Sequence, residues 1–192
     1  MRQNALAEKT KDRVEIFLDK LASLDRGELA VLRRNASCTL AEARNAAGLF
    51  YRLLPPGVSE RDEEIYFLVA TLYGLNKHKS KDDFGATMRT VKIKTGREGI
   101  DRRMAILLDS EFDLIDGFRS GGGEMAYRLR QCVKLASGHE VGVDWGALLR
   151  DLLQWSRPGK RVRKQWARSY YGKHEGEAAE AAREIEGGNA RC

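Results

Sequence analysis

The sequence predicts an all-α protein, a compact helical bundle of about nine helices built as one body or as two packed lobes. Apolar residues recur at intervals of three and four along most of the chain, and capping residues precede these segments. The 192 residues include only three prolines, so few helices are interrupted. Two β-branched stretches, residues 91–93 and 141–143, are too short to build a sheet.

The N-terminal half contains five predicted helices, most of them opened by a capping residue. The fourth is apolar on most of its sides and is therefore predicted to form the centre of the core. The helices cover residues 14–24, 26–35, 39–53, 59–75 and 80–88, and their caps are Asp25, Thr39 with Glu42, Ser59 with Asp62, and Ser80 with Asp83.

The C-terminal half begins with residues 89–99, which are basic and interrupted by glycine and so predict a loop. Further helices are predicted over residues 101–108, capped by Asp101, then 110–121, 125–136, 144–155, capped by Asp144, and 160–171. The predicted core includes Leu68, Leu72, Leu107, Leu148, Leu152 and Trp155. Residues 172–192 lack apolar anchors and predict a disordered tail, which leaves residues 1–171 as the helical body.

Positive charge predicts a polyanionic partner. The whole chain carries +6, and residues 172–192 hold five Glu against Lys173, Arg183 and Arg191, a net of −2, so residues 1–171 carry +8. One cluster lies in residues 89–103 and a second in 157–168, and single helical cations occur at Arg33, Arg34, Arg128, Arg130 and Lys134. The alternative is that these charges are only solvated, or, for Arg33 and Arg34, that they cap a helix.

No constellation of residues predicts catalysis, a metal site or a cofactor. The histidines are isolated, the three cysteines are far apart, and residues 121–123 (Gly-Gly-Gly) lack the Lys-Ser/Thr of a phosphate loop. The cysteine pattern fits a reducing cytosol, and no apolar run is long enough for a membrane span, so we expect a cytoplasmic protein without a membrane partner. Aromatic residues do not interleave with the basic loop, which favours sequence-independent contact with a nucleic-acid backbone.

Several motifs follow one another along residues 14–171. They include Asp25-Arg26-Gly27, Val69-Ala70-Thr71-Leu72-Tyr73, Asp83-Phe84-Gly85, Arg102-Arg103, Asp144-Trp145 with Trp155, and Trp166-Ala167 with Tyr170-Tyr171. Each motif is weak alone, since most of its residues pack in a core. Their joint order and spacing resemble the CasB family, the small subunits of type I-E CRISPR Cascade surveillance complexes.

The resemblance implies an all-α, non-catalytic subunit whose partners are crRNA, target DNA, other Cascade subunits and a second copy of itself placed head to tail. It also implies that the subunit stabilises the displaced strand of the R-loop. The implied nucleic-acid-binding residues are Arg33, Arg34, Arg102 and Arg103, with Lys92, Lys94 and Arg97 as neighbours, and we add Arg130 and Lys134 for their charge. The alternatives are a stand-alone helical nucleic-acid-binding protein or regulator, and a helical enzyme whose site combines distant residues.

Overall fold

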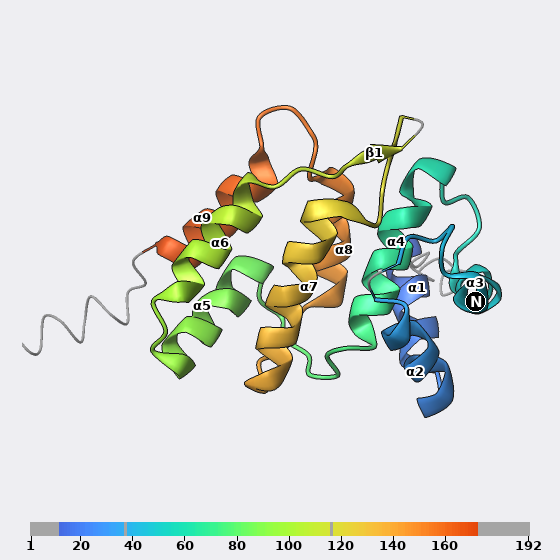
Figure 1. Cartoon of the computed structure of the whole chain (residues 1–192), viewed down its shortest axis with the longest axis horizontal. Helices are drawn as coiled ribbons and strands as arrows, with labels where there is room; N and C mark the ends of the chain where they lie inside the picture. The colour runs from blue at the N-terminus through green and yellow to red at the C-terminus, as the bar shows by residue number, and fades with distance from the viewer. Residues whose placement is uncertain (1–11, 37, 116, 173–192) are drawn as a thin grey trace, which may run out of the picture.

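The computed structural model describes residues 12–36, 38–115 and 117–172. More than half of these residues are helical, which confirms the predicted all-α class, and the remainder include one small hairpin (Figure 1). The elements of the described ranges are α1 (Arg13–Ala22), α2 (Arg26–Arg34), α3 (Arg44–Leu53), α4 (Glu60–Tyr73), α5 (Phe84–Thr95), α6 (Gly99–Asp109), β1 (Leu114–Ile115), β2 (Phe118–Arg119), α7 (Gly123–Gly138), α8 (Trp145–Gln154) and α9 (Arg161–Tyr171).

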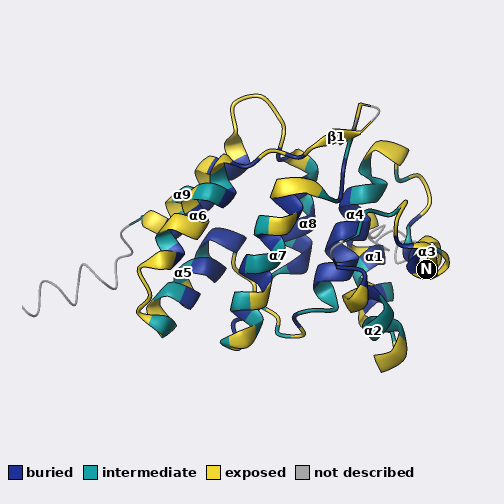
Figure 2. Ribbon diagram, viewed as in Figure 1, coloured by how far each residue is buried: buried dark blue, intermediate teal, exposed yellow. Residues whose placement is uncertain are grey.

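One hydrophobic core runs through the described part of the chain. Helices α1 to α4 gather at one end, α5, α6 and α9 gather at the other, and α7 and α8 lie between them (Figure 1). A single cluster of buried apolar side chains includes residues from all of these helices, and Figure 2 shows buried residues where α4, α7 and α8 meet. The predicted core residues are confirmed as buried, at 3% exposure or less: Leu68, Leu72, Leu107, Leu148, Leu152 and Trp155.

Two of the predicted helix caps, Asp25 and Asp144, are confirmed by their hydrogen bonds, whereas the cap predicted at Ser80 is wrong, because that helix is capped three residues later by Asp83. The carboxylate of Asp25 accepts from the Glu28 amide at 2.8 Å, that of Asp83 from the Ala86 amide at 2.9 Å, and that of Asp144 from the Ala147 amide at 2.8 Å. Each bond satisfies an amide that has no partner within its own helix. The disordered tail predicted for residues 172–192 lies, apart from Gly172, outside the described residues.

The loop predicted over residues 89–99 is wrong. Helix α5 continues to Thr95 and ends at Gly96, whose φ of 62° is left-handed. Lysines propagate a helix well, and Lys92 and Lys94 lie in its last turn, where cations are favourable. The cap predicted at Asp101 is also wrong, because α6 begins at Gly99 and Asp101 lies in its first turn.

The helix predicted over residues 110–121 is wrong as well, since β1 and β2 form an antiparallel hairpin there. Ser110 ends α6 rather than opening a new helix: its hydroxyl donates to the Ile106 carbonyl oxygen at 2.7 Å. Gly117 has a φ of 80°, as a tight hairpin turn requires. The predicted start of the third helix at Thr39 is also too early, because residues 39–42 form a separate turn and α3 begins at Arg44.

Asp101 joins α5, α6 and α9. Its carboxylate accepts from the Lys92 ammonium at 2.8 and 2.9 Å and from the Tyr170 hydroxyl at 2.8 Å. These hydrogen bonds, from Lys92 first and Tyr170 second, hold the pKa of the Asp101 carboxyl below its ordinary value. The network therefore stabilises the folded state only while Asp101 is ionised.

Replacing Leu72 with alanine should leave a cavity at the centre of the core, because this side chain is fully buried. We expect the Leu72→Ala variant to lose about 2–5 kcal/mol of unfolding free energy. Chemical denaturation followed by circular dichroism measures the loss, and an unchanged midpoint would show that α4 is not the centre of the fold.

Acid should remove the stabilisation that Asp101 contributes. Because its folded pKa is depressed, the contribution is present above the ordinary carboxyl pKa of about 3.9 and is lost as the pH falls below it. The effect should be small, since the pair is largely exposed. Thermal melts of the parent and of Asp101→Asn between about pH 7 and pH 2 should therefore differ at neutral pH and converge in acid. A gap in melting temperature that stays constant over this range would contradict the role given to the Asp101 charge.

Candidate nucleic-acid interface

Helices α6 and α7 pack against each other, and both carry cations. Cys132 is buried on α7, and this burial raises the pKa of its thiol to about 12, while the charges of Arg103 on α6 and Arg128 on α7 act in the opposite direction. The charges of the two helices therefore both act on a side chain at the contact between α6 and α7. Arg103 and its neighbour Arg102 are exposed, so the seam between α6 and α7 presents positive charge to solvent.

The outer side of α7 continues this charge. Tyr127, Arg130 and Lys134 are spaced by three and four residues and so share one side of the helix. Arg130 donates from Nη1 to the Ala36 carbonyl oxygen at 3.0 Å, which ties α7 to the segment after α2. Lys134 is exposed. Tyr127 was not predicted as a site residue from the sequence, although its place just before Arg128 and Arg130 on a predicted helix was a usable signal.

Arg33 and Arg34 are the last two residues of α2, the helix that precedes Ala36. Both are exposed. The backbone of Arg33 packs against Gly74 so closely that a Cβ atom on Gly74 would lie 3.0 Å from the Arg33 nitrogen, which fixes the end of α2 against the end of α4. The elements that carry the predicted site residues thus follow one another through the fold, from α2 to α7 and from α7 to α6 (Figure 1). The residues are Arg33, Arg34, Arg102, Arg103, Arg130 and Lys134.

The remaining predicted site residues, Lys92, Lys94 and Arg97, lie at the end of α5 and in its connection to α6. The ammonium of Lys92 is held by Asp101 and lies 5.8 Å from the centre of the Tyr170 ring. Lys94 donates to the His139 carbonyl oxygen, just beyond the end of α7, at 3.4 Å. Arg97 is exposed in the short connection between α5 and α6. Lys94 and Arg97 are therefore placed to extend the positive surface, whereas Lys92 is engaged within the fold.

The second basic cluster, residues 157–168, divides into one structural arginine and several exposed cations. Arg163 is only 6% exposed, forms an ion pair with Glu111, and lies 5.0 Å from the centre of the Trp155 ring. The exposed cations belong to the loop before α9 and to its outer side: Arg157, Lys160, Arg161, Lys164 and Arg168.

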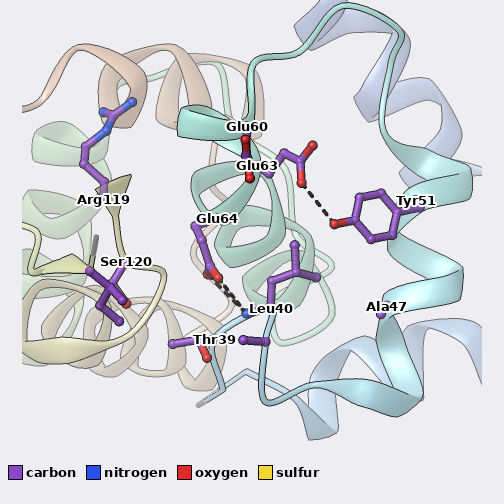
Figure 3. Close-up of a pocket in the computed structure, with 11 residues that line it drawn as sticks. Thr39, Leu40, Ala47, Tyr51, Glu60, Glu63, Glu64, Arg119 and Ser120 are labelled. Atoms are coloured by element: carbon purple, nitrogen blue, oxygen red, sulfur yellow. Dashed lines mark hydrogen bonds between the residues drawn. The ribbon is translucent and has the colours of Figure 1, made fainter. Parts of the chain in front are cut away.

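A cavity of about 500 Å³ near the hairpin has the opposite charge. Glu60, Glu63 and Glu64 project into it from α4, and Figure 3 shows them facing the Leu40 segment and Tyr51. Glu63 accepts from the Tyr51 hydroxyl at 3.1 Å, and Glu64 accepts from the Leu40 amide at 3.0 Å. Burial raises the pKa of the Glu64 carboxyl, while amide donors act against that shift. Arg119 also lines this cavity, but the three carboxyl groups outnumber it, so the cavity disfavours phosphate.

The described residues contain no group of three or more His, Cys, Asp or Glu side chains that could hold a metal ion. Within the same ranges, no helix combines the length and the apolar character needed to cross a bilayer.

Comparison with known proteins places the chain in a family. The family described as CRISPR-associated protein Cse2 matches residues 28–171. A CRISPR-associated protein Cse2 of Thermus thermophilus is 35% identical over 115 residues, so the aligned stretch covers 59% of this chain and only 59% of that relative.

Solved structures agree with that match. A Cse2-family protein from Thermus thermophilus has a TM-score of 0.69 at 29% identity, over 85% of this chain and 100% of that one. CasB from M. ruber has a TM-score of 0.66 at 26% identity, over 83% and 93%. A chain of a CRISPR RNA-guided surveillance complex, 17% identical over 88% and 97%, shares the fold with a TM-score of 0.66. Because the family match extends over well more than half of the sequence, the chain belongs to the CRISPR-associated Cse2 (CasB) family, as its motifs predicted.

Proposed function

We propose that this protein is a non-catalytic small subunit of a cytoplasmic type I-E CRISPR Cascade complex. In this role it binds crRNA and target DNA and stabilises the displaced strand of the R-loop. Membership of the Cse2 family supports the proposal, as does a shared fold with a chain of an RNA-guided surveillance complex. The observation that supports the nucleic-acid role is that α2, α6 and α7 carry exposed cations, while α7 contacts both α6 and the segment after α2.

The proposed contact residues are the exposed arginines Arg33, Arg34, Arg102 and Arg103. Arginine suits this task because its planar guanidinium can bind a phosphate through two parallel hydrogen bonds. Arg130, Lys134, Lys94 and Arg97 extend the surface, and Lys92 contributes through its field rather than by contact, because Asp101 holds its ammonium. The acidic cavity near the hairpin is a poor site for phosphate.

Such a surface binds without reading sequence. Each phosphate that a cation neutralises releases counterions, so affinity comes from the number of contacts and falls as salt rises. In an RNA-guided complex, base pairing with the guide selects the target, and the protein subunits recognise backbone and shape. A positive helical surface is therefore sufficient for a subunit that holds a strand already selected by pairing.

Assembly with other Cascade subunits and with a second copy of the chain separates this proposal from a stand-alone nucleic-acid-binding protein. The full chain, tagged and purified from cells that express its companion CRISPR proteins, should carry those proteins and a guide RNA with it. Recovery of the chain alone, or with random nucleic acid only, would favour the stand-alone alternative.

Removing the four proposed contact arginines should change the salt dependence of binding. If each neutralises about one phosphate, a quadruple alanine variant at positions 33, 34, 102 and 103 should flatten the slope of log K against log salt by roughly 3–4 on duplex DNA, or about 3 on a single strand. Binding titrations at several salt concentrations measure this slope. The fold should survive, since Arg33 and Arg34 contribute at most about 1 kcal/mol as cations at a helix end.

A control with the same change of charge tests whether position matters. Alanine at the exposed residues Arg157, Lys160, Arg161 and Lys164 removes four positive charges from the loop before α9 and from α9 itself. The control should keep most of the parent's slope. A control that loses the slope, beside a quadruple arginine variant that keeps it, would move the interface to α9.

A further inference from the structure

Tyr127 is an exposed tyrosine whose ring lies beside the guanidinium groups of Arg128 and Arg130. Its relative exposure is 46%, and two other tyrosines are as open: Tyr51 at 54% and Tyr171 at 51%. Those two hydroxyl groups have partners, since Tyr51 donates to Glu63 and Tyr171 donates to the Asp101 carbonyl oxygen. Within the described ranges, the Tyr127 hydroxyl forms no hydrogen bond, and its ring is flanked by cations instead.

The two flanking guanidinium groups are held by the fold. The Arg128 guanidinium carbon lies 5.6 Å from the centre of the Tyr127 ring, and that of Arg130 lies 5.4 Å from it. Arg128 donates to the Glu124 carboxylate at 3.1 and 3.3 Å, and Arg130 donates to the Ala36 carbonyl oxygen. At 5.4–5.6 Å both cations lie within cation–π range of the ring, and 46% of the residue remains exposed to solvent.

We propose that Tyr127 is a stacking site for an unpaired nucleobase, with the neighbouring cations of α7 and α6 holding the phosphates on either side. This rests on the proposed function, because it assumes that nucleic acid lies on the α2–α6–α7 surface. A base in a duplex is covered on both faces by its neighbours, so only a base of a separated strand offers a free face to the ring. The site therefore adds recognition of strand separation to a surface whose cations recognise phosphate alone.

A single strand that lacks some of its bases distinguishes binding by stacking from binding by phosphate contact. The experiment measures fluorescence-anisotropy titrations of the full chain with two labelled single strands of equal length, one of them abasic over its central residues. Both strands carry the same phosphates, so charge is matched; a duplex would change charge density together with base access. The parent should bind the complete strand at least about 5-fold more tightly, the lower end of the range for stacking of a base on an aromatic ring.

Substitutions then assign that difference to Tyr127. Tyr127→Ala should bind both strands with the affinity that the parent shows for the abasic strand. Tyr127→Phe keeps the ring without the hydroxyl and should retain the preference. Tyr51→Ala, which removes an equally exposed ring beside the acidic cavity, should behave as the parent does.

Each other outcome overturns a stated part of the reasoning. Equal binding of the two strands by the parent, with a steep salt dependence, would overturn the stacking site and leave the proposed function standing. An equal loss of affinity for both strands in Tyr127→Ala would show that the ring only positions Arg128 and Arg130. No salt-dependent binding to either strand would overturn the proposed function, and the stacking site with it.

Discussion

The burial of α4 is the constraint on which the rest of the fold depends. Eight consecutive residues, Ile65 to Leu72, are buried, so this helix has no side that can face water and must be covered all round. Helices α2, α7 and α8 and strand β2 supply that cover. Glu64, at the edge of the buried run, accepts from the amides of Leu40 and Gly121 and so anchors both the segment after α2 and the turn that leads into α7. The burial of α4 therefore determines the positions of α2 and α7, which carry part of the positive surface.

The arginines of this chain serve two purposes that a count of charge cannot separate. Arg163 is enclosed by Glu111, Trp155 and the Leu108 carbonyl oxygen, and Arg119 joins the hairpin to Asp62 and to the last carbonyls of α8. Removing the partner of such a cation would leave a buried charge uncompensated, so these arginines are fixed by the fold. Cations free to meet a phosphate are those whose helices turn them outward, as α6 does with Arg102.

Local patterns predicted the elements that depend on local physics. Asp25 and Asp144 cap their helices as expected, because an N-cap requires only residues three positions apart. The cap of α5 was misplaced from Asp83 to Ser80. The hairpin was missed because Ser110 and Asp113 imitate a capping box, although the sequence Asp116-Gly117 between apolar residues is typical of a two-residue turn. The candidate site was predicted only in part. Exposed charges could be found from the sequence, but the Arg163–Glu111 and Arg130–Ala36 contacts join segments 52 and 94 residues apart and follow no periodicity.

Phosphate contact and base stacking respond differently to salt. This difference determines which nucleic acids the α2–α6–α7 surface prefers at a given salt concentration. Counterion release weakens each arginine–phosphate contact as salt rises, whereas stacking of a base on the Tyr127 ring involves no net charge and persists. At low salt the surface should hold any nucleic acid, and as salt rises its relative preference should move toward strands with free bases. Every base has a face that can stack, so this preference adds no sequence requirement. A subunit with both contacts can thus favour a separated strand and leave the choice of sequence to the guide RNA.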